Sequence, residues 1–436
     1  MSKDKKNNPE IFGSKDIMFV YVKNKDDKPL MPCHPAKARI LLKKGKAKVV
    51  DRTPFTIRLL YQADNNIQDV NLGVDAGSKY IGLSSTTEKK ELFKAEVELR
   101  QDIPKLLESR KSLRRSRRSR KLRYRPARFD NRGKKGRIAP SIQHKIDCHI
   151  TIIKKVSNIL PIKNIIVETA EFDVQKLKNP NISGKEYQNG ASAGFYNVKS
   201  AVLHRDNYKC QICGEKQAKL EVHHIRFRSQ DGSNSMDNLV VLCSECHSKV
   251  HSGELTFDKK PKSFKHPTHM NIMRKKLIKQ LQKDFNNVFE TFGYLTKYNR
   301  ENLGIEKSHV NDAFIISHNP DAERLDVEYL YRKVRRHNRS IHKNKPSKGG
   351  LRKRNQSAYI VNGFRRFDKV MYKNIVCFIT GKRSSGYFQL KTFDGTVISQ
   401  GVNSKKLKLL EPVKGWLIDR RTEIPPRPKE VEVSLP

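Results

Sequence analysis

The stretch that most constrains the fold is an apolar run at residues 72–84, which reads LGVDAGSKYIGLS. This pattern predicts a buried strand, a tight turn that glycine permits and a second strand, so Asp75 would stand where the first strand meets a cleft. A hairpin acid that faces water explains the same letters, because short motifs of this kind recur by accident. Asp75 therefore needs partners from elsewhere in the chain before it indicates a site.

Two later segments offer such partners. Residues 164–168, Asn-Ile-Ile-Val-Glu, repeat the pattern of a buried strand that delivers an acid, Glu168, at its end. Two further acids follow closely and stay open as alternatives, Glu171 and Asp173. His309 and Asp312 stand three residues apart at the start of a predicted helix, so they share one face. The candidate set is therefore Asp75, Glu168, His309 and Asp312.

The chain carries far more positive than negative charge. Its 436 residues include 90 Lys and Arg against 45 Asp and Glu, which leaves a formal net charge of +45. Such self-repulsion calls for a polyanion as partner, and nucleic acid is the natural one. No apolar run approaches the roughly 18 residues of a membrane span, and the basic N-terminus lacks the apolar core of a signal peptide. We therefore expect a soluble protein of the cytoplasm, without a membrane partner.

The positive charge is concentrated in residues 105–128, which contain a single acid. A helix from Asp102 to about Tyr124 is expected, because Pro104 falls in its first turn and no breaker follows before residue 126. Its cations repel one another unless phosphates neutralise them, and the planar guanidinium favours the backbone of a structured RNA. A solvated face or a disordered basic arm is the plainer alternative. The residues expected to bind nucleic acid are Arg110, Arg114, Arg115, Arg117, Arg118, Lys121 and Arg125.

Two Cys-x-x-Cys pairs are separated by residues that predict a loop and a strand pair. In a reducing compartment such pairs indicate a metal rather than disulfides, and their spacing is typical of a tetrahedral four-cysteine zinc site. The expected zinc ligands are Cys210, Cys213, Cys243 and Cys246. The other cysteines, Cys33, Cys148 and Cys377, are expected to be packing residues.

Several further polar residues lie between and just after the cysteine pairs. If four thiolates hold the zinc, the histidines among these residues, His223, His224 and His247, are free for another role. Alternatively, one or more of these histidines complete a zinc finger that binds its target without catalysis. Residues 222–251 resemble the HNH nuclease motif, a ββα-metal fold around one divalent cation. The resemblance implies that His224 is the general base, that His223 and His247 bind the metal, and that Asn238 fixes the loop. His251 is expected to pack or to face solvent, and a role as a further metal ligand stays open.

The set around Asp75 resembles, in its order and contexts, the three separated segments of a RuvC nuclease, which has an RNase H-like fold. The resemblance implies Mg²⁺ (or Mn²⁺) ions held by Asp75, Glu168 and Asp312, with His309 as a ligand or proton shuttle. A RuvC core split in three, an arginine-rich bridge helix after its first segment and an HNH domain inserted before its third together resemble the transposon-encoded IscB family. These proteins are compact relatives of the CRISPR type II effectors, and the Pro-Leu-Met-Pro sequence at 29–32 also matches them.

This resemblance implies an α/β multidomain architecture and an RNA-guided double-strand DNA endonuclease. An omega RNA would guide a monomeric protein to complementary DNA beside a short adjacent motif, where the HNH domain cuts the guide-paired strand and the RuvC domain the displaced strand. The expected domains are a disordered N-terminus (1–15), a PLMP-type domain (16–64), RuvC segment I (65–104), the bridge helix (105–128), RuvC segment II (129–180), the HNH domain (181–265), RuvC segment III (266–330) and a C-terminal region that binds RNA and the adjacent motif (331–436).

Local patterns predict the terminal regions in more detail. We expect a turn at 28–32, a basic helix at 35–44 and a basic stretch, part helix and part linker, at 331–354. The strands of a small β-barrel-like C-terminal domain are expected near 369–372, 375–380, 386–393 and 396–400.

Other functions stay open at this point. A guide-independent HNH homing or restriction-type endonuclease would purify without RNA and cut one fixed sequence. A non-catalytic RNA-binding scaffold would leave DNA intact in magnesium. An actin-like ATPase, suggested only by residues 75–82, would hydrolyse ATP without cutting DNA.

Overall fold

The computed structural model describes residues 19–63, 66–119, 138–169, 195–227, 232–257, 265–335, 342–344, 352–354 and 357–421. The sequence predictions that lie outside these residues are the disordered N-terminus and those for Lys121, Arg125, Glu171 and Asp173. The chain forms two units, one of residues 1–100, 147–169 and 278–436 and the other of residues 101–146 and 170–277. Within the described ranges, no helix is long and apolar enough to span a membrane.

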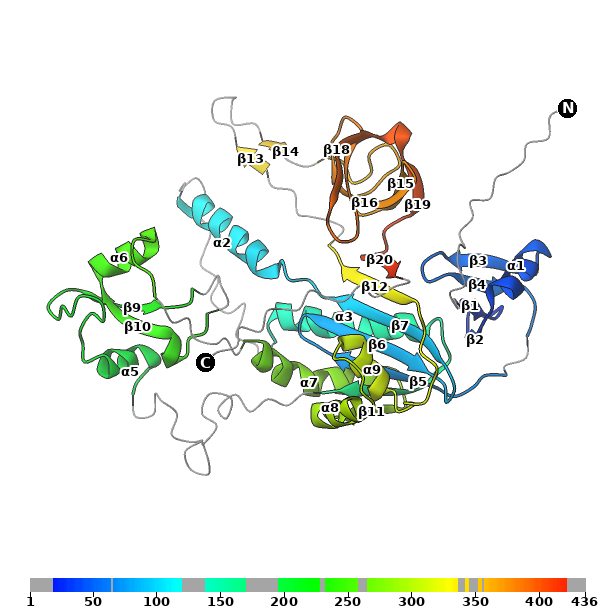
Figure 1. The fold of residues 1–436 in the computed structure, drawn as a ribbon. Coiled ribbons are helices and arrows are strands. Elements are labelled where there is room, and N and C mark those ends of the chain that lie inside the picture. Colours follow the sequence, from blue (N-terminus) through cyan, green and yellow to red (C-terminus); the bar gives the residue numbers. More distant parts are fainter. Residues whose placement is uncertain are drawn as a thin grey trace. The chain divides into compact units, whose positions relative to one another are not determined.

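The first unit begins with a four-stranded sheet in the order β2-β1-β4-β3 and helix α1 (Figure 1). Its elements are β1 (Val20–Lys23), β2 (Pro29–Cys33), α1 (Pro35–Lys43), β3 (Ala47–Asp51) and β4 (Thr56–Leu59). The prediction of a turn at 28–32 is wrong, because residues 29–33 form β2 and pair antiparallel with β1. Its two prolines are tolerated because β2 is an edge strand, where a missing backbone N–H can face away from the ladder.

The core of the first unit is a mixed seven-stranded sheet in the order β11-β8-β5-β6-β7-β12-β20. Its strands are β5 (Val70–Ala76), β6 (Tyr80–Thr86), β7 (Glu91–Glu98), β8 (Ile162–Glu168), β11 (Val288–Thr291), β12 (Glu328–Lys333) and β20 (Trp416–Arg421). β5, β8 and β11 are parallel, whereas β6 is antiparallel to both neighbours. Leu72, Val74 and Ile165 are almost fully buried, as in strands covered on both faces. The mixed α/β class expected from the sequence is confirmed.

Two helices of this unit position the candidate acids. Helix α9 (His309–Ile316) packs on β5 and β6, and α8 (Gly293–Asn302) packs on α9. Ser308 caps α9 by accepting a hydrogen bond from the Asn311 N–H at 3.1 Å, so the helix begins at His309 as predicted. Two longer helices, α3 (Pro140–Ser157) and α7 (Lys265–Asp284), contribute residues to both units.

The C-terminal part forms a five-stranded antiparallel sheet in the order β18-β17-β16-β15-β19. Its elements are β15 (Lys369–Tyr372), β16 (Ile375–Lys382), β17 (Tyr387–Lys391), β18 (Val397–Asn403) and β19 (Lys408–Glu411). The first four strands lie where the sequence predicts them. Helix predicted within 331–354 is not found in the residues described there: β12 extends to Lys333, and β13 (His342–Asn344) pairs with β14 (Arg352–Arg354). Pairing with β7 and β20 decides the strand state of β12, and local propensity cannot report such pairing.

The second unit contains α2 (Ile103–Ser119) and a small ββα arrangement. The latter consists of α5 (Val198–Arg205), β9 (Leu220–His224), β10 (Leu239–Cys243) and α6 (Ser244–Ser252), with β9 and β10 paired antiparallel. Helix α6 ends at Ser252 and is followed by Gly253, whose φ of 91° is the left-handed conformation that favours glycine at a helix C-terminus. The strand pair predicted between the cysteine pairs is therefore present.

Candidate functional site

The first candidate site begins with two neighbouring acids on the large sheet. Asp75 near the end of β5 pairs in register with Glu168 at the end of the parallel strand β8. Side chains in register on adjacent strands point to the same face. The sequence placed each acid at a strand end, and strand pairing makes them neighbours.

Helix α9 lies on that same face because two glycines let it approach the sheet closely. A Cβ on Gly73 would lie 2.0 Å from the Ala313 carbonyl oxygen, and one on Gly82 would lie 1.8 Å from the His309 carbonyl oxygen. Only glycine fits at either position. The approach brings His309 Nδ1 to 2.5 Å from Asp75 Oδ2. Tyr80 stacks on the His309 ring, with ring centroids 5.6 Å apart and planes 29° apart.

Helix α8 covers the site from another side. A Cβ on Gly293 would lie 3.1 Å from Glu168 Oε1, and the Thr296 hydroxyl hydrogen-bonds the same carboxyl group. Arg300, on the same face of α8, is buried and places Nε 3.1 Å from Asp312 Oδ1. The site therefore has an arginine that sequence reasoning missed, because an arginine in a helix is ordinarily a surface residue.

Two of the acids, Glu168 and Asp312, have pKa values raised mainly by burial and further by neighbouring carboxylates. Burial is the main cause that raises the pKa of Glu168 to about 7; Asp75 and Asp312 add to it, against the Thr296 hydrogen bond and the Lys307 charge. Burial also raises the pKa of Asp312, with Asp75 adding and Arg300 opposing. Clustered carboxylates that resist ionisation are a donor set that suits divalent cations, since the cations supply the missing positive charge.

A second cluster lies in the ββα arrangement. The ligand atoms of His223, His247 and His251 all lie within 4.8 Å of one another. Their rings, with those of His224 and Phe227 and the side chain of Val222, line a hollow of about 210 Å³. Burial, followed by the charges of the other three histidines, lowers the pKa of His223 to about 4. His223 is therefore neutral at physiological pH, which is the form of imidazole that binds metals.

The sequence interpretation favoured a packing or solvent-facing role for His251 over that of a further ligand, and the structure places its ring centroid 4.6 Å from that of His247. The spacing of four residues along α6 is the signal that could have found it, because residues i and i+4 share a helix face. Glu221 on β9 was also missed. Its Oε2 lies 3.2 Å from His247 Nδ1, so the carboxylate orients this ring and leaves Nε2 toward the cluster.

His224 and Asn238 lie beside the histidine cluster and differ in their surroundings. His224 follows His223 at the end of β9 and lines the same hollow, with its Nε2 3.0 Å from Asn234 Oδ1. Asn238 is buried and holds the preceding loop: Oδ1 accepts from the Arg226 N–H at 2.8 Å, and Nδ2 donates to the carbonyls of Arg226 and Ser233 at 3.0 and 2.8 Å.

The four cysteines of the two Cys-x-x-Cys pairs form one cluster, with all Sγ atoms within 4.8 Å of one another. Cys213 Sγ and Cys243 Sγ are 3.7 Å apart. A tetrahedral zinc ion with Zn–S bonds of about 2.3 Å requires S···S distances of roughly 3.8 Å, so these residues fit zinc. Within the described part of the chain, the cysteine and histidine groups are the two whose donor atoms converge this tightly. The acids around Asp75 are more widely spread, as two-cation sites allow.

The expected nucleic-acid side chains lie on α2. Arg110, Arg114 and Arg115 are all exposed. Arg117 and Arg118 belong to the same helix. Leu107 and Leu113 are exposed as well, so α2 gains little stability from burial within this unit.

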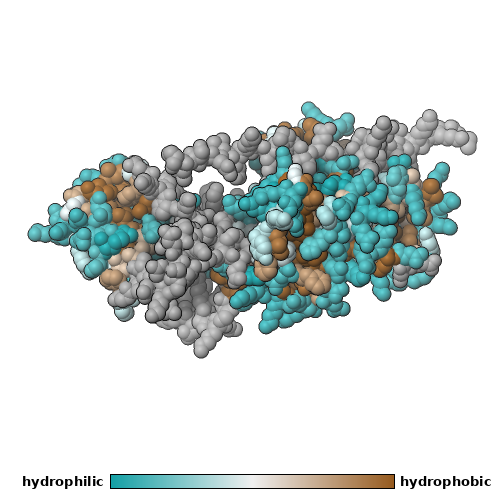
Figure 2. Space-filling model, turned by 60° about the horizontal axis from the view of Figure 1, so that its bottom comes forward, coloured by the Kyte–Doolittle hydropathy of each residue, from teal (hydrophilic) through white to brown (hydrophobic). Residues whose placement is uncertain are grey.

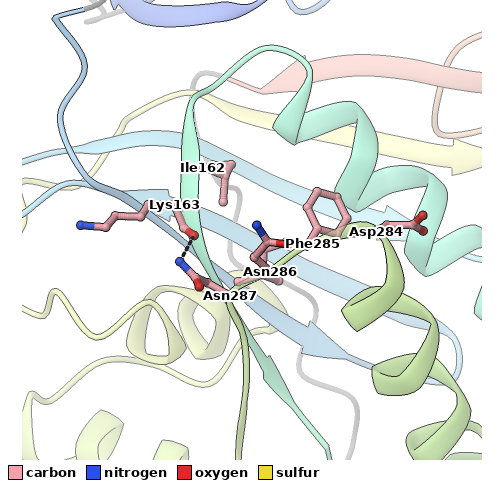
Figure 3. Close-up of a pocket in the computed structure, with 7 residues that line it drawn as sticks. Ile162, Lys163, Asp284, Phe285, Asn286 and Asn287 are labelled. Atoms are coloured by element: carbon pink, nitrogen blue, oxygen red, sulfur yellow. Dashed lines mark hydrogen bonds between the residues drawn. The ribbon is translucent and has the colours of Figure 1, made fainter.

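Another hollow of about 300 Å³ lies at the beginning of β8 and β11, and so is not part of the acidic site (Figure 3). Lys163, Asp284, Asn286 and Asn287 provide its polar lining, and Asn287 Nδ2 donates to the Lys163 carbonyl at 3.3 Å. Glu168 is at the opposite end of β8, roughly 17 Å along the strand.

Two family models match the sequence, an RRXRR protein over residues 20–190 and an HNH endonuclease over residues 210–253. Anaredoxin of Nostoc sp. is 39% identical over 61 residues, which are 14% of this chain and 80% of that protein. The type IV methyl-directed restriction enzyme EcoKMcrA of Escherichia coli is 31% identical over 85 residues, which are 18% of this chain and 29% of that enzyme. Cas9 of Streptococcus thermophilus, solved in complex with the AGAA PAM, aligns with a TM-score of 0.33 and 16% identity over 48% of this chain.

The chain spans about 30% of the length of that Cas9 structure. The family models identify the chain more directly. The RRXRR model includes Asp75, Glu168 and helix α2, and the HNH model includes the cysteine and histidine clusters. With these two models in succession, as the order of its motifs predicted, the chain carries an RRXRR-protein region followed by an HNH endonuclease domain.

Proposed function

We propose that the protein is an RNA-guided endonuclease that cuts both strands of DNA at two separate sites. The observation that carries this proposal is the presence of two chemically different candidate metal sites in one nuclease chain, one of acids and one of histidines. One chain with two such sites can cut two strands independently. The excess of 45 positive charges supports a large nucleic-acid partner.

The proposed architecture is a RuvC core split into segments 65–104, 129–180 and 266–330 around the bridge helix 105–128 and the HNH domain 181–265. The strand order β7-β6-β5-β8-β11, with only β6 antiparallel to the others, supports an RNase H-like fold. The PLMP-type domain would span 16–64. The predicted C-terminal region, 331–436, would bind RNA and a target-adjacent motif through its curled, barrel-like five-stranded sheet (Figure 1), whereas β20 of this region pairs with β12 in the large sheet.

At the acidic site, Asp75, Glu168 and Asp312 would hold Mg²⁺ (or Mn²⁺), which supplies the charge that a phosphodiester needs as it is attacked. His309, hydrogen-bonded to Asp75, orients that carboxylate and can take or give a proton at its other nitrogen. Arg300 keeps Asp312 in place through their 3.1 Å contact. This site would cut the displaced strand.

At the histidine site, His223, His247 and His251 would hold one divalent cation. His224, which lines the same hollow, would take the proton of the attacking water at a ring nitrogen. Asn238 fixes the loop that carries Asn234, the hydrogen-bond partner of His224. The four-cysteine cluster would bind structural zinc and anchor the start of α6. This site would cut the guide-paired strand.

The arginines of α2 would grip the phosphates of an omega RNA, and that RNA would select the target by base pairing. The protein would act as a monomer within this ribonucleoprotein, in the cytoplasm of a prokaryote and on the nucleoid when bound to DNA. Pairing supplies sequence specificity that the protein alone does not need to encode.

Single-site variants of the complex assembled from the host locus test this proposal. Asp75→Ala should leave only the guide-paired strand cut, and His224→Ala should leave only the displaced strand cut, when each strand carries its own end label. The matched control is Asp69→Ala, which removes an exposed acid just before β5. This variant should cut both strands. If either active-site variant lost both cuts while still binding DNA, the two-site model would be wrong.

The similarity to a restriction enzyme over 85 residues favours one alternative, a guide-independent HNH endonuclease. Sequencing of RNA that copurifies with the chain separates the two functions. A guided enzyme retains a defined RNA and changes target when the variable end of that RNA is changed. A guide-independent enzyme cuts one fixed sequence after RNase treatment, and an RNA-binding scaffold cuts none.

A further inference from the structure

Large aromatic and aliphatic side chains are exposed along β11 and α8, at the edge of the large sheet. The exposed residues are Phe289 (53%), Phe292 (42%), Tyr294 (69%), Leu295 (40%) and Tyr298 (64%). Figure 2, which brings the α8 side forward, shows apolar patches within a mostly hydrophilic surface. So many exposed rings within ten residues are unusual for a surface without a ligand.

The same helix forms part of the acidic site with its opposite face. Gly293, Thr296 and Arg300 face Glu168 and Asp312, whereas Tyr294 and Tyr298, four residues apart, share the outer face. Tyr294 directly follows Gly293, which lies against the Glu168 carboxyl group. A strand bound on the outer face of α8 would therefore pass the first turn of the helix, at Gly293 and Tyr294, to reach Glu168.

The chemistry of this surface fits a single strand of nucleic acid. The Phe292 and Tyr294 rings are nearly parallel, with centroids 5.9 Å apart and planes 14° apart. Lys297 lies between the two tyrosines in sequence; its side chain is exposed, and its Nζ is 3.8 Å from Glu301 Oε1, a surface pair weak enough for the ammonium to turn to a phosphate. Aromatic rings beside cations stack unpaired bases, whereas the base faces of a duplex are hidden.

We propose that this aromatic face, Phe292, Tyr294 and Tyr298 on β11–α8, binds single-stranded DNA by base stacking and leads it to the acidic site. The inference rests on the proposed function, because a strand displaced by guide pairing would be the natural occupant. It extends that function by assigning a binding surface for the strand on which the acids act. Mixed-sequence DNA should bind, since every base has a face that can stack.

Photocrosslinking tests the contact directly. A mixed-sequence 20-nucleotide DNA carrying 5-iodouracil is irradiated with the full-length chain in EDTA, and crosslinked peptides are mapped by mass spectrometry. The expected crosslinks fall within residues 289–298 and disappear when the same DNA is made double-stranded. Crosslinks only to other segments, or stronger crosslinks here from the matching RNA than from DNA, would overturn the proposal.

Affinity measurements separate stacking from charge. Electrostatic binding falls steeply with salt, so fluorescence anisotropy of the same oligonucleotide is followed up to high KCl. Tyr294→Ala with Tyr298→Ala should weaken binding at high salt by at least about tenfold, because stacking contributes roughly five- to 150-fold per base. Tyr294→Phe with Tyr298→Phe keeps the rings and should bind as wild type does. The control Tyr196→Ala removes a fully exposed tyrosine from the other unit and should change nothing.

The two hypotheses fail differently. Crosslinks at 289–298 in a protein that does not cut DNA in Mg²⁺ would refute the proposed nuclease activity and leave the stacking surface intact. Cleavage of the displaced strand that is unchanged in the double alanine variant, without crosslinks in this segment, would refute the stacking surface alone. Equal affinity of the double alanine and double phenylalanine variants for the oligonucleotide at high salt would refute base stacking on this face. The aromatic face would then bind another partner, such as a protein or a segment of this chain.

Discussion

Replacing Glu168 by glutamine should stabilise the large sheet when divalent cations are absent. Burial, with help from Asp75 and Asp312, raises the pKa of Glu168 from 4.5 to about 7. An acid with a higher pKa in the folded state costs no stability below pH 4.5, costs progressively more between pH 4.5 and 7, and costs its full amount above pH 7. At 1.36 kcal/mol per pKa unit the full cost is about 3 kcal/mol. The neutral amide of Glu168→Gln avoids this cost.

Urea unfolding can be followed at the sheet that contains this residue. Trp416 is the only tryptophan of the chain and is buried in β20 of the same sheet. In EDTA, Glu168→Gln should exceed the wild type in free energy of unfolding by about 3 kcal/mol at pH 8, and the difference should vanish near pH 4.5. The exposed Glu301→Gln on α8 is the matched control, expected to change stability by less than about 0.5 kcal/mol.

Mg²⁺ should narrow or reverse the difference at pH 8, because a cation that binds the folded wild type stabilises it by mass action. A difference in the free energy of unfolding that does not change with pH would mean that ionisation of Glu168 does not destabilise the folded protein. A wild type more stable than the variant at pH 8 in EDTA would refute the reasoning outright.

Three further substitutions test other parts of the structure. Gly82→Ala should push α9 away from the sheet, because the new Cβ would lie 1.8 Å from the His309 carbonyl oxygen. Cleavage of the displaced strand should fall at least about 100-fold, whereas the cut that depends on His224 persists. The control Gly401→Ala, whose Cβ would make only an ordinary contact at 4.0 Å, should cut both strands normally. Cys246→Ser should lower bound zinc, measured by elemental analysis, and unfold the ββα arrangement at lower temperature; full zinc retention would argue against the four-cysteine site. His251→Ala should abolish the guide-paired cut and weaken Mn²⁺ binding measured by calorimetry, because it removes one of three clustered ligands; normal cutting would return His251 to a packing role.

Local sequence patterns predicted most elements that carry the candidate sites. The strand ending near Asp75, the strand ending at Glu168 and the helix beginning at His309 all lie where the apolar patterns placed them. The Cys-x-x-Cys spacing predicted the four-cysteine cluster. These patterns are legible because alternation, caps and short ligand spacings are set by neighbours in the chain.

Errors arose where distant partners decide the conformation. Residues 29–33 form an edge strand because β1 offers them a ladder, although their prolines suggest a turn. Residues 328–333 become a strand between β7 and β20, elements more than 80 residues away on either side. Arg300 is buried at the acidic site by packing that no local pattern reports, and His251, although exposed, joins the histidine cluster through its place on α6.

The sequence by itself therefore determined which chemical groups this protein can use: strand-end acids, a helix-start histidine, paired cysteines and a surplus of cations. Only the tertiary structure decided which of them meet. The 2.5 Å contact between Asp75 and His309 joins residues 234 positions apart, and it depends on the close approach that Gly73 and Gly82 permit. Local periodicity carries no information about such approach, because the glycines matter through the backbone of a helix more than 200 residues away.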